Sequence, residues 1–276
     1  MCAAVLCFAG LDTSAKWLGR EMDPIFTTWV RYAVNVGLVA LVLNPLTTPR
    51  LLHSNRFALQ VLRSLLLFAC TIMNFFALQY LQLTETMSIQ FTMPLVVALL
   101  AGPLLGEWPG RRRLAVIGIG FCGVLVIARP GLGSVHPAVL LSFVNAVLYA
   151  FYALLTRKLA AHDRASTTIF YSGLAGAILL LPIVPFVWSM PGSATSGLLL
   201  LGMGFFGAAG HGLLTLAHMR APAPVLSPFV YTQIIWMGAL GYLVFGDVPD
   251  LWTLVGGGIV IASGLSLLVA ERRHHA

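Results

Sequence analysis

The chain has 276 residues and a net charge of +7, yet only 9% of its residues are charged and 59% are hydrophobic. Soluble domains carry roughly a quarter of charged residues, so this composition excludes a soluble enzyme, a disordered chain and a disulfide-stapled secreted module. Most of the surface must face lipid or the protein itself. The four cysteines lie in apolar stretches without paired ligand spacing, so we interpret them as small buried residues. The composition indicates an integral membrane protein.

Ten apolar segments follow one another along the chain, and each approaches the roughly 20 residues that cross a bilayer. They are expected at 1–19, 24–46, 57–80, 84–106, 112–130, 137–159, 166–188, 196–217, 223–246 and 250–270. The first segment lacks the basic start and the small-residue cleavage site of a signal peptide, so we keep it as a span. The segments are too long for the strands of a membrane barrel. The sequence predicts an all-α integral membrane protein with ten transmembrane helices.

The second half of the chain repeats the first at a shift of 140 residues. Phe91-Thr92 matches Tyr231-Thr232, and the acidic Gly-Glu-x-Pro step at 106–109 matches Gly-Asp-x-Pro at 246–249. We therefore predict two five-helix repeats, 1–131 and 137–271. An odd number of helices per repeat inserts the two halves upside down relative to each other.

The basic residues support this inverted arrangement. If the N-terminus is cytoplasmic, eleven Lys and Arg residues fall in cytoplasmic connections and two, Arg20 and Arg129, fall outside. This bias follows the positive-inside rule and predicts an inner-membrane protein with both termini in the cytoplasm. The basic residues then orient the protein in the membrane, so the positive net charge does not indicate nucleic-acid binding. We expect the lipid bilayer and a small-molecule substrate as its partners. A monomer and a homodimer both remain open.

These features together resemble the EamA-domain family of the drug/metabolite transporter superfamily. The likeness includes Arg31 in the second span and the run PLVVALLAGPLLGEWPGRRRLAVIGIGFCGVLVIARPG at 94–131. The second repeat departs from the pattern, with Ile234 where the first has Pro94. The segment LDTSAKWL in the first span is similar to metabolite transporters with an Asp and a Lys there. The resemblance implies transport of amino acids, sugars, nucleotide-like metabolites, riboflavin or drugs, often as export.

Polar uncharged residues at mid-span predict a cavity near the membrane midplane. Asn145, Tyr149 and Tyr152 lie at i, i+4 and i+7 and so form one stripe along a helix. Gln90 lies four residues before Pro94, a proline that should bend the span there. Each residue alone is more often an interhelical hydrogen-bonding group than a ligand contact. The substrate-binding candidates are Gln90, Asn145, Tyr149, Tyr152, His211, Tyr231, Gln233 and Trp236.

Charges within the spans are costly and need partners. Asp12 and Lys16 lie one helical turn apart and are expected to pair, and Arg31 is expected to join them in a structural polar cluster in the outer half of the membrane. Arg63 and Glu85 lie near span ends, where we expect interfacial anchoring.

Other motifs carry no chemistry in this chain. Gly118, Gly120 and Gly123 match the dinucleotide fingerprint, but without a preceding strand they indicate helix packing. His211 and His218 share a helix face and lack a third ligand for a metal. We find no Walker, GxSxG or HExxH motif, so no catalytic residue, cofactor or metal is expected.

The favoured hypothesis is a secondary transporter that works by alternating access and exports amino acids, aromatic ones included. Stacking faces and neutral hydrogen-bonding groups in the predicted cavity support it. The first alternative is uptake of a riboflavin-like or nucleoside-like metabolite, which would use the same surface. A membrane-embedded lipid-modifying enzyme would need clustered acids or histidines at one membrane face, and a purely structural subunit would have little use for buried polar groups.

Overall fold

The computed structural model describes residues 1–43, 48, 52–105, 110–128, 136–160, 162–220, 226 and 229–275, with most of their side chains. Within these ranges the chain folds into helices and forms no strand. The first half comprises α1 (Cys2–Leu18), α2 (Pro24–Leu43), α3 (Phe57–Leu78), α4 (Leu83–Gln90), α5 (Met93–Leu105) and α6 (Arg111–Ala128). The second half comprises α7 (Pro137–Ala160), α8 (Ala165–Leu180), α9 (Ala194–Arg220), α11 (Gln233–Leu240) and α12 (Leu251–His275).

These helices confirm the predicted all-α membrane fold. Five of the described stretches, in α2, α3, α4–α5, α7 and α9, are long and apolar enough to cross a bilayer, and four shorter apolar helices accompany them. The outer faces are rich in large hydrophobic side chains, such as Val42 at 80% and Phe186 at 89% exposure. Such a surface suits lipid rather than water.

The same lipid-facing surface corrects the interpretation of the cysteines. Cys70 is buried, but Cys2 and Cys122 are exposed and Cys7 is half-buried. In a membrane protein an apolar environment exists on the outside of the bundle as well as inside, so an apolar neighbourhood in the sequence does not predict burial.

Spans four and nine are each interrupted in the middle. The fourth span breaks after Gln90 and resumes at Met93, because Pro94 has no N–H to donate to the carbonyl of Gln90. Thr92 Oγ1 donates to the carbonyl of Ile89 at 2.7 Å. The ninth span is interrupted at 231–232, where Thr232 Oγ1 donates to the carbonyl of Phe229 at 2.6 Å. The predicted bend at Gln90 is confirmed, and its counterpart forms without proline.

Span seven is shorter than the predicted 166–188. Its helix α8 ends at Leu180, and Pro182 and Pro185 follow, with a short 3₁₀ turn at Val184–Phe186. Prolines just beyond the last turn cannot continue an α-helix, so the rest of the predicted span becomes a connection.

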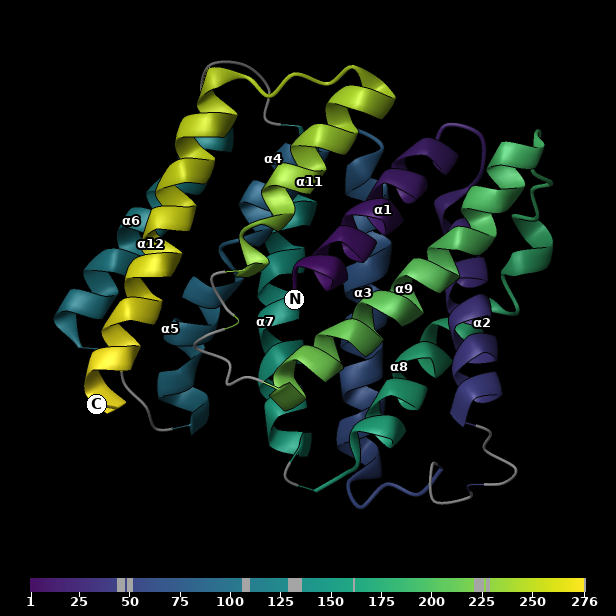
Figure 1. Cartoon of the computed structure of the whole chain (residues 1–276), viewed down its shortest axis with the longest axis horizontal. Helices are drawn as coiled ribbons and strands as arrows, with labels where there is room; N and C mark the ends of the chain where they lie inside the picture. The colour runs from purple at the N-terminus through teal and green to yellow at the C-terminus, as the bar shows by residue number, and fades with distance from the viewer. Residues whose placement is uncertain are drawn as a thin grey trace.

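Helix neighbours repeat between the two halves. The first helix of one half packs against the third helix of the other, as α1 against α9 and α7 against α3, while α2 meets α8 and α6 meets α12 directly. In Figure 1 the α6–α12 pair lies at one edge of the bundle and α2 at the other. A two-fold relation between inverted halves produces this pairing.

Glycines allow α6 and α12 to approach closely. A Cβ placed on Gly256 would lie 2.5 Å from the carbonyl oxygen of Gly123, and one on Gly123 would lie 2.8 Å from that of Gly256. A Cβ on Gly120 would collide with Leu95 of α5. The dinucleotide-like motif is thus a packing motif, as predicted, although a Cβ at Gly118 would meet nothing within 4 Å.

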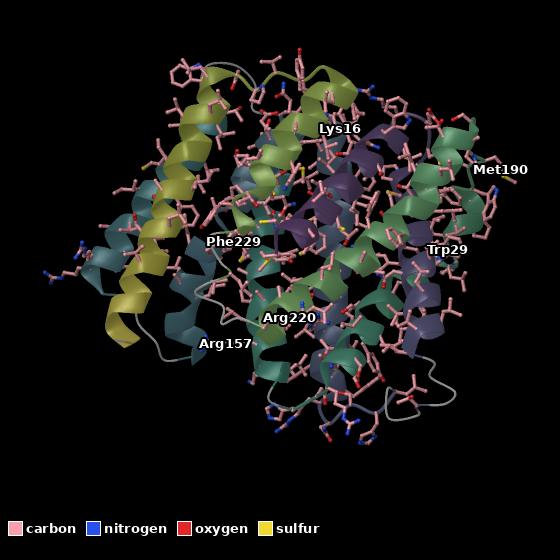
Figure 2. All side chains as sticks on the ribbon, in the orientation of Figure 1. Lys16, Trp29, Arg157, Met190, Arg220 and Phe229 are labelled. Atoms are coloured by element: carbon pink, nitrogen blue, oxygen red, sulfur yellow. The ribbon has the colours of Figure 1, made fainter. Side chains whose placement is uncertain are left out.

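The two ends of the bundle differ in charge. Arg157 and Arg220 lie toward one end and Lys16 near the other (Figure 2). The first end also carries the exposed starts of α3 and α6 with Arg56, Arg111 and Arg112. Helix α6 begins at one end of the bundle, and the helical segment that continues from α11 to Phe245 ends at the other (Figure 1).

Candidate functional site

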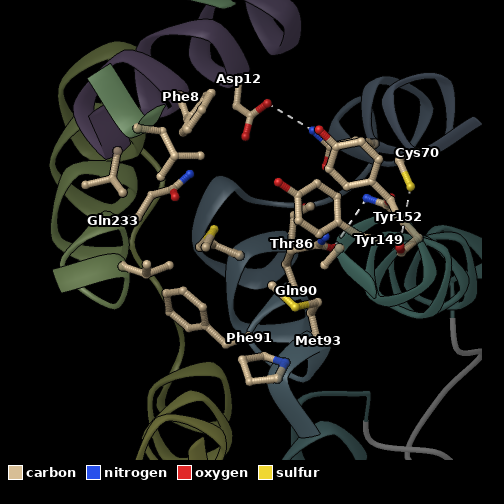
Figure 3. Close-up of a pocket in the computed structure, with 18 of the residues that line it drawn as sticks. Phe8, Asp12, Cys70, Thr86, Gln90, Phe91, Met93, Tyr149, Tyr152 and Gln233 are labelled. Atoms are coloured by element: carbon tan, nitrogen blue, oxygen red, sulfur yellow. Dashed lines mark hydrogen bonds between the residues drawn. The ribbon is translucent and has the colours of Figure 1, made fainter. Parts of the chain in front are cut away.

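A cavity of about 710 Å³ lies in the centre of the bundle. It is lined by residues of α1, α3, the α4–α5 break, α7, α9, α11 and α12, so both halves of the chain build it. Figure 3 shows Asp12, Tyr149 and Gln233 facing one space from three different helices. Ligand pockets of this size accommodate drug-sized molecules.

The cavity brings together all but one of the residues proposed as binding groups. The lining residues from that set are Gln90, Asn145, Tyr149, Tyr152, His211, Tyr231 and Gln233. Trp236 is not among the lining residues; it is 36% exposed, while Gln233 and Met237, one turn apart on α11, are turned inward. The short helix therefore directs Trp236 away from the cavity.

A group of neutral polar side chains lies at the level of the α4–α5 break. Asn145 Nδ2 donates to Gln90 Oε1 at 3.3 Å, which links α7 to α4. The Oδ1 of Asn145 and the hydroxyl of Tyr231 are buried and have no hydrogen-bond partner among the residues that the structure describes. Buried polar groups without partners cost free energy, and at a cavity wall a bound molecule is able to satisfy them.

A second, charged group lines another part of the wall. Asn74 Nδ2 donates to Asp12 Oδ1 at 2.9 Å, and Arg31 Nη1 donates to Thr71 Oγ1 at 3.4 Å. The Arg31 guanidinium also lies over the Tyr32 ring, 4.6 Å from its centroid. Nearby, the His211 ring packs edge-on against Phe8. The structure thus brings Asp12 and Arg31 to one cavity, where their polar partners are neutral side chains.

Lys16 does not pair with Asp12, contrary to the sequence-based expectation. Its Nζ donates to Asp247 Oδ2 at 2.5 Å, across 231 residues. Lys16 and Arg20 both lie over the Phe245 ring at 4.9 Å. A carboxylate and a ring from the opposite repeat offer Lys16 both a salt bridge and a cation–π contact, which Asp12 alone does not. The three charges predicted as one cluster are therefore split between the cavity and the bundle end.

Arg63 is also placed differently from the prediction. It is buried rather than interfacial, and its guanidinium donates to Tyr152 Oη, Thr156 Oγ1, Ser172 Oγ and the carbonyl of Thr168 at 2.7–3.2 Å. These partners come from α7 and α8, so the side chain joins three helices without a carboxylate. Glu85 caps α4 instead of anchoring at the interface, with its Oε2 accepting from the backbone N–H of Gln82 at 3.0 Å.

Several lining residues had not been predicted. Asn74 and Thr71 hold the two charged groups, and Phe8, Phe91 and Met87 supply apolar wall. Phe91 was visible as the repeat counterpart of the candidate Tyr231. Asn74 lies in the apolar stretch TIMNFF, where a single amide is the signal that could have found it.

The cavity reaches toward one end of the bundle and stops short of the other. Around Asp12 its wall includes Leu11, Leu78, Leu83 and Met237, which belong to the main hydrophobic cluster. The Lys16–Asp247 pair lies about one helical turn further on. In the other direction the wall continues to Thr156 and Arg157, in the last turns of α7.

A helical membrane bundle with a central cavity built from both halves is the architecture of a small-molecule transporter. The model of the EamA-like transporter family matches residues 1–129 and again residues 136–269. The chain belongs to this family, and it is a multi-pass membrane transporter.

Named relatives match over almost the whole chain. A riboflavin transporter of Vibrio cholerae is 29% identical over 95% of this chain and 89% of its own length. An S-adenosylmethionine uptake transporter of Rickettsia conorii is 26% identical over 95% and 88%. A riboflavin transporter of Brucella anthropi is 26% identical over 97% and 96%. One solved crystal structure aligns over 99% of this chain and 99% of its own chain, with a TM-score of 0.65 and 16% sequence identity, which shows a similar fold.

Proposed function

We propose that this protein is a secondary transporter that takes up a metabolite made of a flat nitrogen heterocycle and a polar arm. The observation that carries the proposal is a closed-ended cavity whose wall combines aromatic rings with unsatisfied neutral hydrogen-bonding groups. The rings of Tyr149, Phe91 and Tyr231 offer stacking surfaces. The amides of Gln90, Asn145 and Gln233 offer the paired donors and acceptors that a heterocycle edge requires.

The names of the relatives favour this class over amino acid export. Riboflavin and S-adenosylmethionine both join a fused nitrogen heterocycle to a polar, ribose-derived part. The named relatives that match along most of this chain carry these two substrates. Uptake, the first alternative from the sequence, therefore replaces amino acid export as the favoured function.

The mechanism we propose is alternating access with the present structure closed toward the outside. The basic end faces the cytoplasm by the positive-inside rule, and the cavity extends toward Arg157 at that end. The outer end is closed by the apolar cluster around Leu83 and Met237 and by the Lys16–Asp247 pair, which joins the two halves. In this orientation the C-terminal end of α12, which lies at the basic end (Figure 1), faces the cytoplasm, and the protein belongs in the inner membrane.

Purified protein in liposomes tests the proposal with labelled riboflavin, S-adenosylmethionine, adenosine and phenylalanine. We expect saturable uptake of at least one heterocyclic compound. Loss of a neutral hydrogen bond in the Asn145→Ala variant should raise its half-saturating concentration roughly 2- to 13-fold. The matched control is Trp236→Ala on the outer surface, which should transport normally. Uptake of phenylalanine without any heterocyclic compound would restore the amino acid hypothesis and refute ours.

A further inference from the structure

We propose that Asp12 and Arg31 form a recognition site for the zwitterionic head of an α-amino acid attached to the transported heterocycle. Asp12 would accept the ammonium group and Arg31 would bind the carboxylate. This inference rests on the proposed function and narrows its substrate class from any heterocycle with a polar arm to a nucleoside-type compound that ends in an amino acid.

The carboxylate of Asp12 is available on the cavity side. Asn74 donates to Oδ1, and no hydrogen bond to Oδ2 is found among the described residues. Figure 3 shows this carboxylate directed into the space between α1 and Tyr149, with Gln233 across from it. Lys16, one turn away on the same helix, is held by Asp247 and does not neutralise Asp12. Asp12 is the one acidic residue among the lining residues that the structure describes.

The guanidinium of Arg31 is incompletely paired. The residue is 7% exposed, and its Nε has no hydrogen-bond partner in the described part of the chain. Its Nη1 makes a long 3.4 Å contact to Thr71. The guanidinium also lies over the face of Tyr32, an uncharged ring. A cation buried this deeply is costly unless an anion approaches it.

Asp12 and Arg31 line the same cavity without forming an ion pair. In the described parts of the chain, Lys16–Asp247 is the pair whose N–O distance lies within 4 Å. Two opposite charges that form no ion pair with each other, each hydrogen-bonded to a neutral partner, complement a ligand that carries both charges on groups attached to one carbon. An α-ammonium and its carboxylate have this arrangement. A ligand of single charge would leave one of the two residues uncompensated.

The rest of the cavity fits the body of such a ligand. Asp12 lies on one side of the space in Figure 3, and Phe91, Met93 and Gln90 lie on another. The head would therefore point toward the closed outer end, while the heterocycle would lie between the rings and amides at the α4–α5 break. Arg157 lines the cavity as well, at the end of α7 near the basic end, so the Asp12–Arg31 charges belong to the opposite, closed outer part of the cavity.

The test measures how strongly four unlabelled compounds inhibit uptake of the labelled heterocyclic compound by the wild-type protein in liposomes. The four competitors are S-adenosylmethionine, its N-acetyl derivative, its carboxyl methyl ester and adenosine. Acetylation removes the ammonium charge and esterification removes the carboxylate charge. We expect each change to weaken competition about tenfold or more, as expected when a charge-assisted hydrogen bond is lost, and adenosine to compete most weakly.

The Asp12→Asn variant tests whether Asp12 binds the ammonium group. The amide oxygen of the new side chain still accepts the hydrogen bond from Asn74, so the cavity wall is preserved. In this variant S-adenosylmethionine should compete no better than its N-acetyl derivative. Its methyl ester should still compete more weakly than S-adenosylmethionine itself. Trp236→Ala serves as control and should leave the wild-type order unchanged.

Each result decides between the two proposals. Equal competition by all four compounds, or transport of riboflavin alone, would overturn the head-group site and leave the heterocycle transporter standing. In the liposome assay, uptake of phenylalanine without uptake of any heterocyclic compound would refute the proposed function while keeping the Asp12–Arg31 site. If none of these compounds competes, the site is refuted.

Discussion

Phe91 and Tyr231 are related by the 140-residue repeat, and their rings meet edge to face with centroids 4.9 Å apart and an interplanar angle of 63°. Each ring lies at the interruption of its own span. The two halves of the protein thus meet at equivalent positions, where both side chains also line the cavity.

This contact predicts an energetic coupling between the halves. Phe91→Ala and Tyr231→Ala should each lower the thermal stability of the protein in detergent, and the double variant should lose less than the two single losses added together. Aromatic pairs of this geometry contribute about 0.5–1.5 kcal/mol beyond their burial. A second cycle pairing Phe91→Ala with Phe205→Ala, an exposed ring on α9, should be additive. Additivity in both cycles would contradict the coupling.

Arg63 should matter for folding although it is a charge within the bundle. Its four hydrogen bonds to α7 and α8 are each worth roughly 0.6 kcal/mol in a membrane protein, so Arg63→Leu should destabilise by about 2 kcal/mol or more. Arg63→Lys should rescue little, because an ammonium lacks the planar fork. The exposed Arg112→Leu is the control for lost charge. Equal melting temperatures for the Arg63 and Arg112 variants would disprove the structural role.

Neighbouring glycines of α12 differ in how closely they pack against α6. Gly256→Ala places a methyl group against the Gly123 carbonyl and should destabilise by about 1–3 kcal/mol. Gly258→Ala, two residues away with nothing within 4 Å, should be neutral or stabilising because alanine favours helix. Thermal unfolding of both variants checks the pair, and an equal loss at both positions would argue against the close approach.

The loop between α7 and α8 should respond to acid. Burial disfavours ionisation of Asp163, but hydrogen bonds from Ser54 Oγ, Gln60 Nε2 and the backbone N–H of Asn55 outweigh it and lower the pKa of this carboxyl below 3.8. A group with a depressed folded-state pKa stabilises the protein above its unfolded pKa and loses that contribution as the pH falls.

The melting temperature of the wild type should therefore fall more steeply than that of Asp163→Asn as the pH is lowered from about 5 to below 4. At neutral pH the variant should already be the less stable protein. Parallel pH profiles for the two proteins would show that these hydrogen bonds do not favour the ionised form.

The Lys16–Asp247 pair should bias the protein toward closure at the outer end. Lys16→Glu and Asp247→Lys should each increase outside labelling of a cysteine introduced at Leu11, in a chain without its native cysteines, by a membrane-impermeant maleimide. The double exchange should reduce labelling again because it restores opposite charges. Labelling that stays high in the double variant would mean that the pair does not act as a closure.

The sequence predicted the helical fold well because its signals are local or periodic. Apolar length defines spans, and Pro94 marked the interruption of the fourth span, whereas the matching interruption at Tyr231 was not predicted because Ile234 stands where the first repeat has Pro94. Cavity positions such as Asn145 and Gln233 were accessible for the same reason, since a polar residue in mid-span needs a polar surrounding.

The sequence does not determine which residue a buried charged side chain pairs with. Asp12 and Lys16 satisfy the spacing rule for a helical pair, but the rule does not include Asp247, which reaches Lys16 only through the tertiary fold. Arg63 lies close to the start of its helix, yet the packing of α3 against α7 and α8 buries it among hydroxyl groups. Trp236 likewise depended on the rotation of a short helix, which a list of polar positions does not contain.

The exposure of the outer ion pair limits how strongly it acts on the conformational equilibrium. The side chains of Lys16 and Asp247 remain 10% and 23% exposed, and such a pair contributes on the order of 1 kcal/mol. This amounts to about a fivefold change in the ratio of closed to open molecules. The pair therefore sets a resting preference that thermal motion overcomes readily, and most of the resistance to opening must come from separating the apolar side chains beneath it.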